Sequence, residues 1–234
     1  MFDAVAASFI TDRKNSRFKN EGDIEAALTG TSVIEAEYKV PYFAHAPLEP
    51  MNVVVQLKDG QLDIWTGTQI PLFMIKNAAS ITGLRAENIQ LHAQMSGGSF
   101  GRRLEDDYVR QAIELAKAFQ GRPIKMTWTR EEDMTHDFPR PLGIARMRRA
   151  VKYGKVDAYD LSIAYPSVTA SQFGRQNLPI PGPDVAIVAG AWDQPFKIPN
   201  YRVTGYRVPE LVPVSSWALG RRVRQRLPAR LLSR

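Results

Sequence analysis

The chain has 234 residues, 44% of them hydrophobic, which is enough to bury a substantial core as one domain or two subdomains. It contains no cysteine, which excludes disulfides, thiolate metal sites and iron–sulfur clusters held by its own side chains. No apolar run approaches the ~20 residues of a membrane span, and the first ten residues lack the basic start and cleavage site of a secretory signal. These features leave the localisation undetermined.

The net charge of +7 is concentrated at the C-terminal end of the chain. Residues 218–234 contain six arginines and no acidic residue. A nucleic-acid interface spreads Lys and Arg over a folded face with aromatic side chains between them. The charge pattern therefore predicts no nucleic-acid binding.

The first half of the chain predicts short helices and strands after a loose lead-in over residues 1–20. Asp59-Gly60 lies between two alternating segments and is the strongest short hairpin signal in the chain. Pro71 suits a first helical turn and Gly83 a helix end. The expected elements are a helix from 21–23 to Leu28, a strand over 32–40, hairpin strands over 52–58 and 61–66, and a helix over 70–82.

The second half predicts a strand over 89–95, followed by an amphipathic helix that Gly121 and Pro123 end. Proline and glycine are dense between residues 171 and 199, which indicates a long ordered loop. Further strands are expected over 124–130, 143–153 and 156–165. This mixture of hairpins and strand–helix–strand units predicts an α+β fold.

The most informative segment is Met95–Arg103, which reads Met-Ser-Gly-Gly-Ser-Phe-Gly-Arg-Arg between the predicted strand and helix. Glycine allows a ligand to approach the backbone, and a helix N-terminus favours negative charge. Arg102 and Arg103 could add charge-assisted contacts to phosphate or pterin oxygens. The alternative is that the glycines only turn the chain. The loop lacks the Gly-Lys-Ser/Thr of a phosphate-binding P-loop and is not a dinucleotide fingerprint.

Other polar residues give weaker signals. His45 and Glu49 are four residues apart, but Pro47 and Pro50 oppose a helix that would bring them together. We interpret this pair as structural or as support behind a site. Glu131-Glu132-Asp133 is expected to be an exposed acidic turn, and Asp106-Asp107 a helix start.

Seven short motifs, in order and in register, resemble the large molybdenum-binding subunit of the molybdenum hydroxylases. The similarity is strongest to the isoquinoline 1-oxidoreductase beta-subunit branch of the aldehyde oxidase/xanthine dehydrogenase family. The motifs are Ala44–Asn52, Trp65–Pro71, Gly97–Arg103, Trp128–Asp133, Ala189–Trp192, Ile198–Tyr201 and Val212–Trp217.

The resemblance implies a fold, a cofactor and a reaction. Residues 1–40 would end a preceding small, hammerhead-like α+β domain, residues 41–217 would begin the molybdopterin-binding domain, and residues 218–234 would lie outside the family. Molybdenum in a molybdopterin cytosine dinucleotide would hydroxylate N-heterocycles or aldehydes with oxygen from water. Electrons would leave through a 2Fe–2S subunit, with a cytochrome c as a further acceptor. Relatives are often periplasmic.

The resemblance also assigns residues. Gln69 matches a glutamine that hydrogen-bonds an oxygen ligand on molybdenum; alternatively it caps the helix entry at Pro71. Ser99 stands where the family usually has a third glycine. The residues expected beside the cofactor are Gln69, Gly97, Gly98, Ser99, Phe100, Gly101 and Arg102, and no residue of this chain matches the family's catalytic glutamate.

The tail departs from the family after Trp217, where Ala218 replaces an arginine. We expect a frameshift at this point; the alternative is a basic helix over 221–232 that docks a partner. The predicted function is that of a molybdenum hydroxylase fragment that is inactive alone. The alternative is a non-catalytic binding or assembly fragment that complements a separate C-terminal half.

Overall fold

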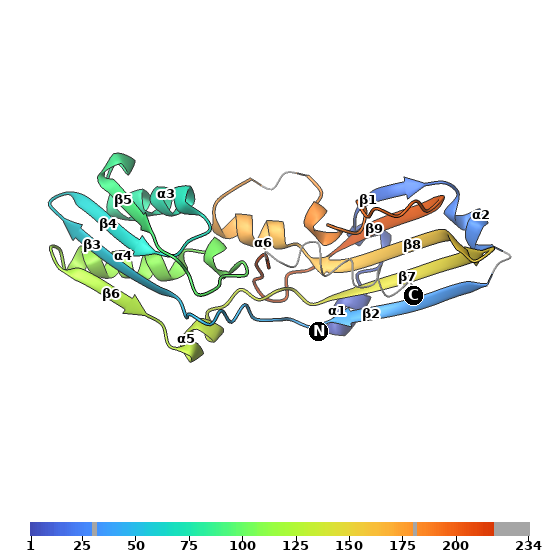
Figure 1. Ribbon diagram of the computed structural model, residues 1–234, viewed down its shortest axis with the longest axis horizontal. Helices are drawn as coiled ribbons and strands as arrows, with labels where there is room; N and C mark the ends of the chain where they lie inside the picture. Colours follow the sequence, from blue (N-terminus) through green and yellow to red (C-terminus); the bar gives the residue numbers. More distant parts are fainter. Residues whose placement is uncertain (30–31, 180–181, 218–234) are drawn as a thin grey trace. The chain divides into compact units, whose positions relative to one another are not determined.

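A computed structural model describes residues 1–29, 32–179 and 182–217. The chain forms two compact units (Figure 1). Among the described residues, unit 1 combines Met1–Phe43 with 139–217, and unit 2 is Ala44–Phe138. The tail over 218–234, with its predicted frameshift or basic helix, lies outside the described residues. The domain boundary predicted between residues 40 and 41 stays a prediction.

Unit 2 contains a four-stranded sheet in the order β5-β4-β3-β6. Strand β4 pairs with β3 in antiparallel and with β5 in parallel orientation. The strands are β3 (Asn52–Lys58), β4 (Gln61–Thr66), β5 (Ile89–Ala93) and β6 (Pro123–Thr127); the helices are α3 (Pro71–Thr82), η2 (Ala86–Asn88), η3 (Arg102–Leu104), α4 (Asp107–Ala118) and α5 (Arg130–Thr135).

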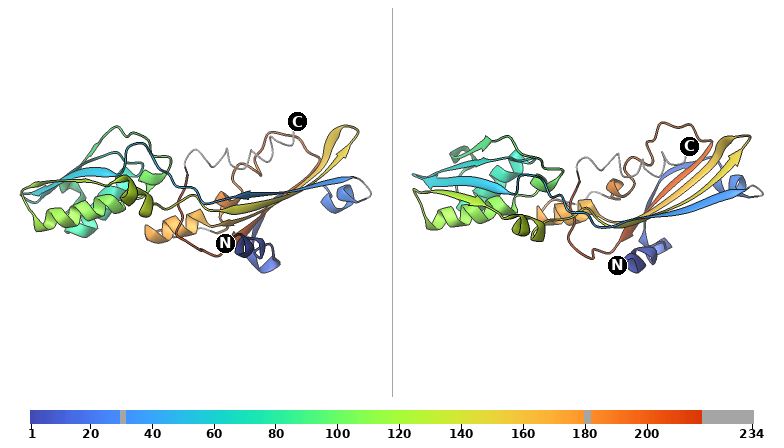
Figure 2. Two further views of the ribbon diagram at one scale, coloured as in Figure 1. Left: turned by 90° about the horizontal axis from the view of Figure 1, so that it is seen from below. Right: turned by 60° about the horizontal axis from the view of Figure 1, so that its bottom comes forward.

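The core of unit 2 forms where α3 and α4 pack against the sheet (Figure 2). Alternate side chains of β3 and β4 are buried, as expected for strands with one covered face. They pack with Met74 of α3 and with Val109 and Ile113 of α4. The helices and the sheet thereby fix the two chain segments that follow β4 and β5.

Unit 1 contains a five-stranded sheet in the order β1-β9-β8-β7-β2, in which only the β8–β9 pair is parallel. Residues around η4 cover one face, and α1 and α2 each cover part of the sheet. The elements are α1 (Phe2–Ala6), η1 (Thr11–Arg13), β1 (Lys14–Glu21), α2 (Ile24–Leu28), β2 (Val33–Val40), β7 (Gly143–Lys152), β8 (Lys155–Pro166), α6 (Val168–Arg175), η4 (Val185–Ile187) and β9 (Asn200–Val208).

A buried carboxylate on this sheet leads to a pH prediction. Asp160 accepts hydrogen bonds from Arg202 at 2.8 Å and from Arg148 at 2.7 Å. Burial opposes ionisation, but these two arginines outweigh it and lower the pKa of Asp160 below its ordinary value of 3.8. Asp160 therefore stabilises unit 1 above pH 3.8, and this contribution disappears as the pH falls through the lower folded-state value.

Asp160→Asn should therefore be less stable than wild type near neutral pH, and the difference should shrink below about pH 4. Urea unfolding of both proteins from about pH 7 to pH 3 would measure it. Asp157→Asn on the same strand is the control, because the Asp157 side chain makes no ion pair among the described residues. A difference that is constant with pH would contradict the assignment.

The α+β class and most predicted elements are confirmed, but three predictions are wrong and one strand was missed. Residues 1–20 are not a loose lead-in, because α1 packs into the unit 1 core and β1 pairs with β9. The strand predicted over 124–130 ends at Thr127, and α5 follows. The loop predicted over 171–199 begins within α6 and contains η4, and β9 was not anticipated.

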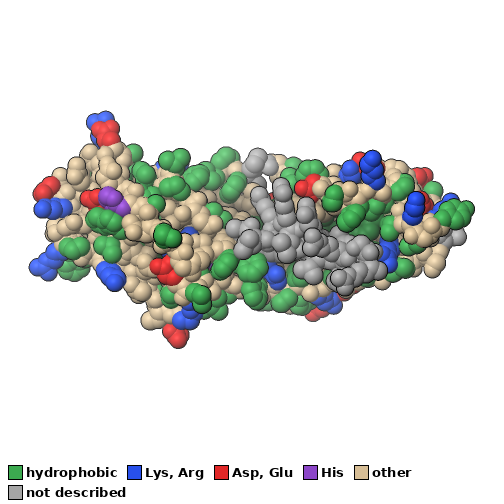
Figure 3. Space-filling view, in the orientation of Figure 1, with side chains coloured by type: hydrophobic (Ala, Val, Ile, Leu, Met, Phe, Trp, Pro, Cys, Tyr) green, Lys and Arg blue, Asp and Glu red, His purple; other side chains and the backbone are tan. Residues whose placement is uncertain are grey.

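The described residues show neither a membrane-crossing helix nor, on the face in Figure 3, a large patch of one charge. No helix in the described part of the chain is long and apolar enough to cross a membrane. On the face shown in Figure 3, basic and acidic side chains of the described residues are interspersed and do not form a large patch of one sign.

Candidate functional site

The glycine loop, which we define as residues 95–101, connects β5 to η3 and has an unusual backbone. Gly98 has φ 99°, Phe100 55° and Gly101 114°. Glycine adopts such angles without steric cost, whereas a bulky residue such as Phe100 does so only under strain. Strained residues of this kind persist only where the surrounding structure holds them.

The space around the loop explains two of its glycines. A Cβ on Gly97 would lie 2.7 Å from the Cβ of Glu49, which is closer than real side chains approach. A Cβ on Gly98 would lie 3.2 Å from Cε2 of Phe100 and 3.4 Å from the Cβ of Pro47. Glycine is therefore required at position 97 for close contact and favoured at position 98 by its backbone angle.

The loop also presents backbone donors. Among the described residues, the N–H groups of Gly98 and Ser99 have no hydrogen-bond partner, and both residues are partly exposed. Successive N–H groups in a turn with residues of opposite φ sign form a concavity that binds anionic groups. These two amides fit the anionic edge of a large ligand.

The structure places the backbone of Gln69 beside Arg103, which follows the glycine loop. The N–H of Gln69 donates to the carbonyl of Arg103 at 3.0 Å, and the Gln69 side chain is exposed. No side chain caps the start of α3 at Ile70, so the alternative capping role of Gln69 is not seen. The segments after β4 and β5 therefore lie side by side, as the two parallel strands dictate.

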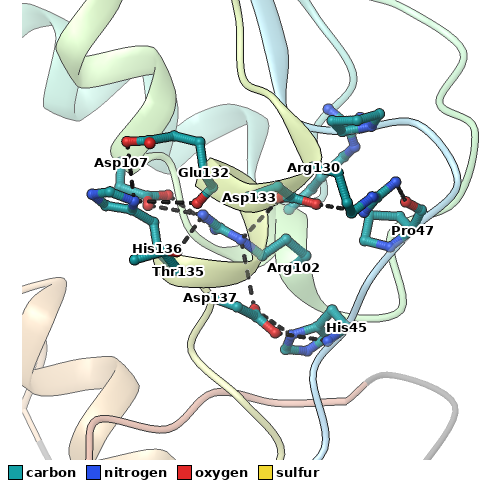
Figure 4. A network of polar contacts seen from close by, with 12 residues as sticks. His45, Pro47, Arg102, Asp107, Arg130, Glu132, Asp133, Thr135, His136 and Asp137 are labelled. Carbon is teal, nitrogen blue, oxygen red and sulfur yellow. Dashed lines mark hydrogen bonds and ion pairs between the residues drawn. The ribbon is translucent and has the colours of Figure 1, made fainter.

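Arg102 lies in a buried charged cluster beneath the loop (Figure 4). It forms a bidentate pair with Asp107 at 2.9 and 2.8 Å, and its Nε lies 3.6 Å from Asp137. Burial opposes the charged form, but the hydrogen bond and charge of Asp107 raise the pKa of Arg102. The guanidinium groups of Arg102 and of equally buried Arg103 thus bind groups of the protein. Their predicted contact with phosphate or pterin oxygens stays a prediction.

The prediction that Glu131-Glu132-Asp133 forms an exposed acidic turn is wrong. Asp133 lies in α5 and is only 2% exposed, pairing with Arg130 at 2.9 Å. Burial is the largest influence and raises the pKa of Asp133 despite the nearby arginines. Thr129 caps this helix by accepting from the N–H of Glu132. The sequence Thr-Arg-Glu-Glu is a capping-box pattern, and it could have predicted the helix.

His45 and Glu49 each bind other groups of the protein and do not form a shared site. The His45 side chain is fully buried, and its Nδ1 lies 2.8 Å from Asp137. Glu49 instead accepts from the N–H of Gly97 at 2.6 Å. Within the described residues, no group of three or more His, Cys, Asp and Glu side chains could hold a metal ion.

Residues 9–217 match the family of the molybdopterin cofactor-binding domain. Isoquinoline 1-oxidoreductase subunit beta of Brevundimonas diminuta is 36% identical over 45% of this chain and 14% of its own length. The membrane-bound pyrroloquinoline-quinone aldehyde dehydrogenase of Gluconacetobacter polyoxogenes is 29% identical over 81% of this chain and 25% of its own length.

Solved structures show the same fold. Quinoline 2-oxidoreductase from Pseudomonas putida 86 superposes with a TM-score of 0.66 at 18% identity, covering 86% of this chain and 26% of that one. Aldehyde oxidoreductase from Desulfovibrio gigas gives 0.64 at 23% identity, covering 81% of this chain and 20% of that one. This chain thus spans about a quarter or less of the length of these relatives. The resemblance inferred from the seven motifs is confirmed, and the chain belongs to the molybdopterin cofactor-binding domain family of the aldehyde oxidase and xanthine dehydrogenase relatives.

Proposed function

We propose that this chain supplies part of the cofactor site of a molybdenum hydroxylase, with the glycine loop against the cofactor. The observation that carries the proposal is the geometry of Gly98, which has positive φ, no Cβ and an unpaired N–H beside another at Ser99. This is a surface that a pterin or phosphate edge can approach closely. The adjacent exposed amide of Gln69 adds a neutral hydrogen-bonding group.

Each residue has a distinct proposed role. Gly98 and Ser99 would offer backbone N–H groups to the cofactor, Gly97 would lie beside them against Glu49, and Phe100 and Gly101 would shape the turn. Gln69 would hydrogen-bond a polar group of the cofactor through its side chain. Arg102 would act from below the loop, since its side chain binds Asp107. When bound, the cofactor supplies the oxidative hydroxylation itself, and the protein orients it.

The proposed substrates, cofactor form and partner subunits follow from the relatives of this chain. The names of two relatives, isoquinoline 1-oxidoreductase and aldehyde oxidoreductase, support N-heterocycles or aldehydes as substrates. We further propose the cytosine dinucleotide form of the cofactor, a 2Fe–2S partner subunit and a cytochrome c acceptor. Because the chain spans a quarter or less of its relatives, we propose that activity requires a polypeptide that supplies the remaining domain. Without that polypeptide, the chain would act only in binding or assembly.

A Gln69→Ala substitution tests the proposal in a complex of this chain with such a polypeptide. Turnover should fall about tenfold to a hundredfold while bound molybdenum stays near the wild-type level, because one hydrogen bond is lost and the glycine loop remains. Gln90→Ala, at an exposed position of β5, is the matched control and should change neither quantity. Unchanged turnover in Gln69→Ala would refute the role of Gln69. A wild-type complex without molybdenum would refute the function.

A further inference from the structure

Consecutive arginines after the glycine loop form separate ion pairs. Arg102 binds Asp107, as described above. Arg103 is 1% exposed and places Nη2 3.0 Å from Oε2 of Glu49. Its other guanidinium contacts are to the carbonyl oxygens of Gly67 at 3.3 Å and of Gly98 at 3.5 Å. Arg103 therefore ties the loop to Glu49, which lies 54 residues earlier in the chain.

Glu49 also holds the opposite end of the loop. The same Oε2 atom accepts from the N–H of Gly97 at 2.6 Å, and the N–H of Glu49 donates back to the carbonyl of Gly97 at 3.2 Å. Its other oxygen, Oε1, accepts from Nδ2 of Asn52 at 2.9 Å. One carboxylate thus links Gly97, before the strained turn, to Arg103, after it.

The charge of Glu49 suits this arrangement. Partial burial opposes ionisation, but the hydrogen bonds from Gly97 and Asn52 and the charge of Arg103 outweigh it and lower the pKa of Glu49. The group is therefore a carboxylate at neutral pH, and hydrogen bonds to an ionised acceptor are stronger than neutral ones.

The loop needs such support, because Gly98, Phe100 and Gly101 all have positive φ between the two attachment points. We propose that Glu49 is a positioning residue whose carboxylate holds the glycine loop in its ligand-accepting conformation before any ligand binds. The identity of the ligand rests on the function proposed above, whereas the positioning role does not. A loop that is ordered in advance spares the ligand the entropic cost of ordering it.

Nuclear magnetic resonance on the full chain, labelled with ¹⁵N-glycine and without cofactor, tests this role. In the wild type, the Gly97 amide should exchange slowly and Gly98 should have an order parameter near that of rigid backbone, about 0.85. In Glu49→Ala, Gly97 exchange should rise about tenfold or more, and the Gly98 order parameter should fall below about 0.6. Glu49→Gln should be intermediate, because its amide oxygen can accept from Gly97 but carries no charge for Arg103.

The matched control is Glu87→Ala, which removes an exposed glutamate of unit 2 that pairs with Arg85 and should leave both glycines unchanged. Wild-type values at Gly97 and Gly98 in Glu49→Ala would overturn the proposal. If Glu49→Ala fails to fold, Glu49→Gln tests the proposal instead. Wild-type values at Gly97 and Gly98 in Glu49→Gln would then overturn the proposal. No cofactor is present, so this outcome is independent of the molybdenum content measured in the Gln69 experiment.

Discussion

Arg102→Ala should destabilise unit 2 by about 3–5 kcal/mol, the usual cost of removing one partner from a buried charge cluster. The side chain is 1% exposed and lies among the carboxylates of Asp107, Asp133 and Asp137. Two of these carboxylates, on Asp133 and Asp137, are themselves almost fully buried. Without the guanidinium, their negative charges would be left with less compensation in a medium of low dielectric constant.

Urea unfolding of the full chain, followed by tryptophan fluorescence, measures this effect, because Arg102 lies 5.4 Å from the Trp128 ring. Arg85→Ala is the matched control. It also removes an arginine paired with an acid, Glu87, but both side chains are exposed, at 77% and 62%. The control should cost about 1 kcal/mol or less. Equal losses in the two variants would show that the cluster beneath the loop has no special importance.

Gly98→Val should reduce cofactor retention to background in the complex with the supplied remaining domain. Valine strongly disfavours the φ of 99° found at this position. Its Cβ would also crowd Phe100 and Pro47, so the loop would have to shift and its unpaired N–H groups would lose their arrangement. Elemental analysis of molybdenum per chain gives the result.

Gly121→Val is the control that separates backbone strain from the loss of cofactor binding. Gly121 has φ 81°, so valine is strained there too, but nothing lies within 4 Å of the added Cβ. Both variants should lose some stability, and only Gly98→Val should lose molybdenum. Molybdenum retained in Gly98→Val would mean that these glycines only turn the chain.

The elements predicted well are those with local signals. Asp59 and Gly60 both adopt positive φ in the β3–β4 turn, and Gly83 ends α3 in the left-handed conformation. These residue types alone indicate such turns. By contrast, β1 is polar and pairs irregularly with β9, so its alternation is weak. β9 pairs in parallel with β8 across a long connection, and no short-range pattern specifies such a pairing.

The residues of the site also differ in how well the sequence predicts their roles. The glycine loop of the site was recognisable because its three glycines lie between a predicted strand and helix and belong to one of the seven family motifs. The role of Arg103 was not, because its partner Glu49 lies 54 residues earlier in the chain and meets it only in the folded unit. A sequence shows that an arginine is available, and only the fold decides whether it contacts a ligand or a buried acid.

The central claim is that the cofactor binds at the glycine loop, and hydrogen exchange measured by mass spectrometry tests it most directly. The complex with the supplied remaining domain would be compared with and without bound molybdenum cofactor. The amides of Gly98 and Ser99, within residues 97–101, should become protected on loading, because their unpaired N–H groups gain acceptors. Residues 84–88, around η2 in the same unit, should not change. Protection that is absent from 97–101 in a fully loaded complex would contradict the account.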